Sequence, residues 1–144
     1  MNPLNPPHPS PDFAPSKTVS AWLALVLGGL GVHRYYLGAA FWWIYPLPLA
    51  LCFPFLWRIE DWLTHPLLLL PVAVILFSTI EAIVFALTPD AKWDARYRPA
   101  PHTPSQSGWG AVWVAIIGLM FGAGLLMSML AIHIQRWLMD GVVR

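Results

Sequence analysis

Long apolar stretches separated by short polar connectors are the feature that most constrains how this chain can fold. The clearest runs from Pro66 to Leu87 and contains a single charge, Glu81. Another, from Trp109 to Trp137, is apolar over almost its whole length. A helix needs about 20 consecutive apolar residues to cross the hydrocarbon core of a bilayer. Both stretches therefore predict membrane-spanning helices.

Two further apolar segments precede these. The first, Val19 to Val32, is short and reaches spanning length only if it continues through Leu37. The second, residues 39–57, is free of charge but is interrupted by three prolines. Each proline removes a backbone hydrogen bond, and the freed carbonyl needs another partner inside the protein. We expect this second segment to be either a proline-kinked span or a re-entrant hairpin.

Composition supports the same class of protein. The chain is 58% hydrophobic and 10% charged, whereas about a quarter of a soluble domain is charged. The net charge of +1 gives no field that would attract nucleic acid, and the single cysteine, Cys52, excludes an internal disulfide. The fold expected from the sequence is an all-α integral membrane helical bundle with about four membrane segments.

Proline-rich and polar stretches divide the chain into five parts. We expect a disordered proline-rich tail over residues 1–16 and a membrane domain over residues 17–98. A polar, proline-rich linker (99–108) then leads to an additional transmembrane helix (109–137), and a short polar tail (138–144) ends the chain. With four spans, both termini would lie on the same side of the membrane.

A glycine-rich motif, GGLGVHRYYLG, occupies residues 28–38 where the first apolar segment ends. It resembles the signature of the TM-two domain family, small membrane proteins with two transmembrane segments that are also called NINE proteins in bacteria. The resemblance covers about half of the chain and implies a membrane location, but the family has no established biochemical activity. The matching positions are Gly28, Gly29, Gly31, His33, Arg34, Tyr35, Tyr36, Leu37 and Gly38.

The second membrane helix of that family usually carries a tryptophan followed by an aspartate, and the best counterparts here are Phe77 and Glu81. Arg34 and Glu81 are then two charges at membrane depth, where a charge usually pairs or faces water. If the first three segments all span, both residues fall at similar depth on one side and form an intramembrane pair. Such a pair could fix helix order or line a substrate or proton path. We expect the adjacent His33 to be a hydrated interfacial residue.

The last apolar segment presents small side chains on one helical face, which allows a neighbouring helix to approach closely. These residues are Ala111, Ala115, Gly118 and Gly122. We expect this face to pack against protein and not against lipid.

Catalytic and metal-binding motifs are missing from the sequence: it has no HExxH, no GxSxG and no P-loop, and its histidines lack ligand spacing. We therefore expect no catalytic residue, cofactor, metal or small-molecule substrate. The expected function is that of a non-catalytic scaffold whose partners are the lipid bilayer and other membrane helices, including further copies of itself. The alternative is a small transporter or channel subunit with Arg34 and Glu81 along a polar path. The expected location is a bacterial inner membrane, crossed several times.

Overall fold

The computed structural model describes residues 14–98 and 104–142, which form helices joined by turns, with no strand among them. The all-helical class expected from the sequence is confirmed for these residues. The α-helices are α1 (Lys17–Leu27), α2 (Val32–Tyr36), α3 (Pro46–Leu56), α4 (Leu69–Leu87), α5 (Asp90–Tyr97) and α6 (Trp109–Val142). Single 3-10 turns connect them: η1 (Gly28–Leu30), η2 (Trp42–Ile44), η3 (Trp62–Thr64) and η4 (Pro66–Leu68).

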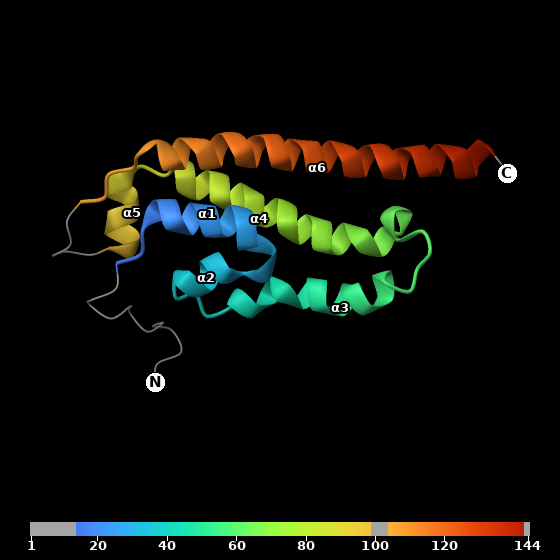
Figure 1. Cartoon of the computed structure of the whole chain (residues 1–144), viewed down its shortest axis with the longest axis horizontal. Helices are drawn as coiled ribbons and strands as arrows, with labels where there is room; N and C mark the ends of the chain where they lie inside the picture. The colour runs from blue at the N-terminus through green and yellow to red at the C-terminus, as the bar shows by residue number, and fades with distance from the viewer. Residues whose placement is uncertain (1–13, 99–103, 143–144) are drawn as a thin grey trace.

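Prolines set several helix boundaries. Pro46 begins α3, where its fixed φ suits the first helical turn and its missing N–H costs nothing. Thr88 ends α4 in an extended conformation because Pro89 disfavours helical backbone in the residue before it. Asp90 then opens α5, and a carboxylate is favourable at a helix N-terminus. The break at Thr88 allows α5 to lie across the end of the bundle (Figure 1).

Helices α1, α3, α4 and α6 lie along the long axis of the molecule, and α4 packs against the other three (Figure 1). Helix α1 begins at the end occupied by α5, whereas α6 starts near α5 and runs to the opposite end. The start of α1 and the end of α6 therefore lie at opposite ends of the bundle. If the long axis of the bundle crosses a bilayer, this arrangement puts the two ends of the chain on opposite sides, unlike the expectation of both termini on the same side.

The first apolar segment does not continue through Leu37 as one helix, which the four-span expectation required. Helix α1 stops at Leu27, and Gly31 has a left-handed backbone (φ 70°) that ends η1 and reverses the chain. Helix α2 then runs back toward the start of α1, where the backbone N–H of Ser16 donates to the Tyr36 hydroxyl at 3.1 Å. The segment is a short helical hairpin because its glycines permit the reversal.

Two helical segments are long and apolar enough to cross a membrane: Pro66–Leu87 and Trp109–Gly141. The stretches Lys17–Leu30 and Trp42–Leu56 are apolar but shorter. The expected number of about four spanning segments is therefore too high by this criterion. Helix α3 runs along α4 without folding back on itself (Figure 1), so the proline-rich segment is not a re-entrant hairpin. The chain reverses at Gly31 instead.

The C-terminal half of the chain differs from the expectation at both edges of α6. This helix extends through Val142, so most of the expected polar tail over residues 138–144 is helical. At the other edge, Ser105 and Ser107 are hydrogen-bonded to α5, which fixes the last part of the expected linker. Most of the proline-rich tail and residues 99–103 of the linker lie outside the described residues.

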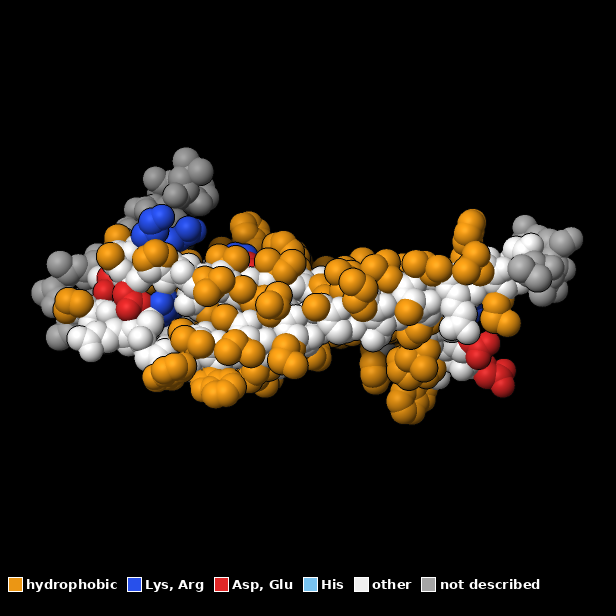
Figure 2. All heavy atoms as spheres, turned by 90° about the horizontal axis from the view of Figure 1, so that it is seen from above, with side chains coloured by type: hydrophobic (Ala, Val, Ile, Leu, Met, Phe, Trp, Pro, Cys, Tyr) orange, Lys and Arg blue, Asp and Glu red, His pale blue; other side chains and the backbone are white. Residues whose placement is uncertain are grey.

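Packing inside the bundle uses small side chains, and the large ones face outward. The buried cluster between α1, α4 and α6 consists of Ala21, Ala24, Ala82, Ala86, Ala111 and Val114. Outside, hydrophobic side chains cover most of the length between the two ends, where charged groups gather (Figure 2). Water-soluble bundles bury their large apolar residues, whereas close approach through small residues is the packing mode of helices in lipid.

The small-residue face of α6 lies against protein in the structure. Ala111 is buried, and Ala115 packs beside the alanine cluster. A β-carbon added to Gly118 would lie 3.0 Å from Cγ1 of Ile83, and one added to Gly122 would lie 3.2 Å from Cγ2 of Thr79. These two glycines therefore set how closely α6 approaches α4.

We predict that Gly118→Ile lowers the stability of the protein in detergent by about 1 to 3 kcal/mol, the usual cost of overpacking a close contact. The matched control is Gly124→Ile on the same helix, where a β-carbon meets nothing within 4 Å. Thermal unfolding of both variants provides the measurement. Equal melting temperatures for the two variants would show that α6 does not pack on α4 through Gly118.

Candidate functional site

A polar cluster forms around Glu81, a residue in the last two turns of α4 whose side chain is 13% exposed. Arg34 on α2 forms an ion pair with Oε1 of this carboxylate through Nη2, and its Nε donates to Oε2 at 3.4 Å. The Tyr45 hydroxyl, from the residue before α3, donates to the same Oε2 at 2.5 Å. The structure thus brings together Arg34 and Glu81, which the sequence analysis paired, and adds Tyr45.

His33 is a third donor to the carboxylate. Its Nε2 lies 2.7 Å from Oε2 of Glu81, and the ring is fully buried. The edge of the ring meets Tyr45, with ring centroids 5.1 Å apart at an interplanar angle of 89°. The expectation of a hydrated, interfacial His33 is therefore wrong, because the reversal of the chain at Gly31 turns this side chain into the bundle.

Two glycines of the motif position the cluster. Gly28 lies directly against the side chain of Ser78 on α4, so any larger residue would push the hairpin away from α4. Gly31 has a φ of 70°, and a β-carbon there would meet the carbonyl of Trp42 and lie 3.0 Å from Cβ of Tyr45. The turn is therefore packed on the segment that carries Tyr45, which brings that hydroxyl and His33 to the same carboxylate.

The rest of the motif serves the return of the chain. Tyr35 is exposed and packs edge-on against Trp42 at 5.5 Å between ring centroids. Tyr36 accepts the hydrogen bond from Ser16, Leu37 caps α2, and Gly38 has the second left-handed backbone among the described glycines. The motif therefore encodes a turn and two contacts that hold the returning chain, Tyr35 with Trp42 and Tyr36 with Ser16.

Chemically, the cluster is a clamp that joins three segments through one anion. A buried carboxylate needs a counter-charge and hydrogen bonds, and Arg34, His33 and Tyr45 supply both. Among the described residues, no group of three His, Cys, Asp or Glu side chains could hold a metal ion. What this arrangement can do is fix α2 and the start of α3 against α4.

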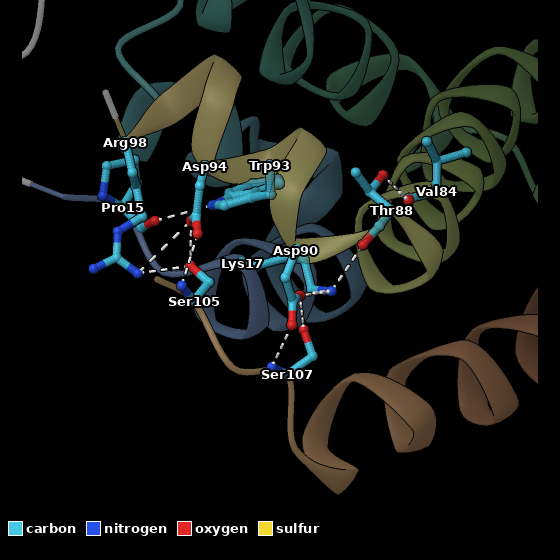
Figure 3. Close-up of polar contacts among 10 residues, drawn as sticks. All are labelled: Pro15, Lys17, Val84, Thr88, Asp90, Trp93, Asp94, Arg98, Ser105 and Ser107. Carbon is cyan, nitrogen blue, oxygen red and sulfur yellow. Dashed lines mark hydrogen bonds and ion pairs between the residues drawn. The ribbon is translucent and has the colours of Figure 1, made fainter. Parts of the chain in front are cut away.

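A second polar network holds the start of α1 and the segment before α6 on α5 (Figure 3). Nζ of Lys17 lies 2.5 Å from Oδ1 of Asp90 and donates to the carbonyl of Thr88 at 2.8 Å. Ser107 donates to Asp90 from its backbone N–H at 2.8 Å and from its hydroxyl. These hydrogen bonds, first that from Lys17 and then those from Ser107, lower the pKa of Asp90 from 3.8 to about 2.

The same end of the molecule carries two further contacts. Nε1 of the buried Trp93 donates to the carbonyl of Pro15 at 3.1 Å. Asp94 accepts the backbone N–H of Ser105 at 2.7 Å, and hydrogen bonds from Ser105 lower the pKa of Asp94. This network was not predicted from the sequence, since its partners are up to 78 positions apart. The sequence feature that could have indicated it is a pair of aspartates one helical turn apart, Asp90 and Asp94, followed by the serines of the linker.

Comparison with known proteins adds no relative: searches against protein-family models, curated proteins and solved structures each gave no match. The geometry of the two polar networks and the distribution of apolar side chains are therefore the observations on which a function can be argued.

We predict that Arg34→Ala and Glu81→Ala each lower the free energy of unfolding by about 1 to 3 kcal/mol. The first leaves the largely buried Glu81 carboxylate without its counter-charge, and the second leaves the buried His33 and Tyr45 without their acceptor. The double variant should regain part of the summed loss, since removing both partners leaves less uncompensated charge. Arg58→Ala, at an exposed arginine outside the cluster, is the control. Strictly additive losses in this double-mutant cycle would mean that the two side chains do not interact.

Proposed function

We propose that this chain is a multi-pass protein of a bacterial inner membrane that acts as a non-catalytic scaffold for other membrane helices. The observation that carries the proposal is the inverted side-chain distribution, with alanines inside and large apolar groups outside. In water the exposed apolar surface would promote aggregation, whereas in a bilayer it would face acyl chains. The resemblance of residues 28–38 to the TM-two signature supports the same location.

In this proposal three segments cross the membrane, and a fourth enters it and returns to the same side. Helices α4 and α6 cross it, and the α1–α2 hairpin enters and returns to the side of α5. Helix α3 is short, but it follows α4 from the hairpin to the far end (Figure 1). If α4 crosses, the segment around α3 must also cross, because residues 37–41 before it line one cavity with Arg96 and Tyr97 of α5. Three crossings and one hairpin replace four spans.

The scaffold role is supported by the exposure of α6. Beyond Gly122 most side chains of this helix are exposed, Met127 to 67%, and near its far end the helix meets η3, where Arg136 donates to the Thr64 hydroxyl. A long apolar helix with an exposed second half leaves a face on which another membrane helix, or α6 of a second copy, could pack. We propose these helices and the bilayer as the partners.

The transporter alternative has less support. Both oxygens of Glu81 are occupied by donors from within the chain, and releasing them for a passing ion or solute would break the clamp on α4. We therefore assign Arg34 and Glu81 a structural role, and we assign no residue a catalytic one.

We predict that proteoliposomes containing the protein show the same potassium and proton flux as empty liposomes. In native membranes that contain the same protein, a photo-cross-linking amino acid at Met127 on α6 should capture protein, including a second copy. The comparison position is Phe53 on α3, which is similarly exposed. Flux above that of empty liposomes that disappears in Glu81→Gln would favour the transporter. Lipid adducts alone at both positions would remove the support for a scaffold.

A further inference from the structure

Two cavities share Arg34 in their linings. The first, of about 570 Å³, lies between the end of α2, α4 and α5 and includes Arg34, Glu81, Arg96 and Tyr97 in its lining. The second, of about 480 Å³, is an open groove beside α4 with a mostly apolar lining that includes Leu70, Val74 and Phe77. Arg34 and Phe41 line both, so a polar chamber continues into an apolar groove.

The polar chamber carries one excess positive charge, since two arginines face one carboxylate. Glu81 is already bound by Arg34, His33 and Tyr45, whereas the Arg34 side chain remains 38% exposed. Arg96 lies over the ring of Tyr97, 5.4 Å from its centroid, and pairs with no carboxylate among the described residues. Two arginines in the lining of one chamber are suited to a phosphate, which arginine binds through several N–H donors.

The chamber and the groove together have the length of a lipid chain in one leaflet. Its lining on α4 extends from Phe77 back to Leu70, and Leu70 lies eleven residues before Glu81. At about 1.5 Å per residue this separation is roughly 16 Å along the helix axis. Half of a hydrocarbon core of about 30 Å is close to the same length. The polar chamber lies at the α5 end, where headgroups would be if α4 crosses the bilayer.

We infer that the chamber and the groove together bind one anionic glycerophospholipid. Its phosphate lies between Arg34 and Arg96, and one acyl chain lies along α4 past Phe77 toward Leu70. The inference rests on the proposed membrane location and deepens it, because it gives the protein a selective lipid partner. A soluble phosphate compound would use the chamber alone, and a partner helix would use the groove alone.

The test uses the full-length protein, purified in mild detergent, stripped of lipid and titrated with dioleoyl phosphatidylglycerol. Native mass spectrometry measures the bound lipid, with dioleoyl phosphatidylcholine and inorganic phosphate as separate arms. One phosphatidylglycerol should bind per chain, more tightly than phosphatidylcholine. Arg96→Gln should weaken it about fivefold, the effect of one basic group at an anionic membrane surface. Lys92→Gln is the matched control, because Lys92 is an exposed cation on α5 that lines neither cavity.

A second pair of variants tests the groove. Ala73 lines it, so Ala73→Trp should fill it and weaken phosphatidylglycerol binding, while Ile80→Trp, exposed on α4 outside both linings, should not. Equal binding of the two lipids, or equal losses in Arg96→Gln and Lys92→Gln, would overturn the inference. Inorganic phosphate that binds as tightly as the lipid would also overturn it. Lipid binding that Ala73→Trp leaves unchanged would do the same, and is the result expected if a partner helix, and not an acyl chain, occupies the groove.

A separate measurement on the same protein distinguishes this inference from the membrane location on which it rests. Resistance of the liposome-bound protein to alkaline carbonate extraction reports insertion. Inserted protein without selective phosphatidylglycerol binding overturns the lipid site alone. Protein that carbonate extracts from liposomes overturns both the lipid site and the proposed membrane function.

Discussion

The carboxylate of Glu81 is the group on which the N-terminal half of the structure depends. An ionised side chain removed from water needs a counter-charge and hydrogen bonds, and here the donors come from α2 and from the residue before α3. Both segments must therefore lie at the depth of Glu81. The chain meets this requirement by reversing at Gly31, and the course of α3 along α4 follows from that reversal.

The two polar networks lie toward the same end of the bundle, so the helices are cross-linked by polar contacts mainly at that end. Near α5, the Glu81 cluster and the Lys17–Asp90 contact tie the hairpin, α4, α5 and the start of α6 together. Toward the other end, contacts between small side chains give way to a largely exposed α6 that meets η3 through Arg136 and Thr64. Specific binding is therefore expected at the α5 end, and association with other helices is expected along the far part of α6.

Local patterns in the sequence indicated the helical class, the packing face of α6 and the Arg34–Glu81 pair. They did not indicate the reversal at Gly31, because a glycine with a positive φ and a glycine in close helix packing look the same in one sequence. The pair was argued from a continuous first span, yet it forms through a hairpin. Tyr45 and His33 were missed since the depth of each depends on that reversal, and the α5 network was missed because its partners are distant in sequence.

The path of residues 14 to 60 is the most direct test of this account. Single cysteines at Ala14, Ala40 and Glu60, in a Cys52→Ala background that removes one buried thiol, can be labelled with a membrane-impermeant maleimide from either side. The account predicts that positions 14 and 40 react from one side and position 60 from the other. If position 14 reacts from the same side as position 60 and opposite to position 40, the first segment crosses the membrane as one helix, and the hairpin is wrong.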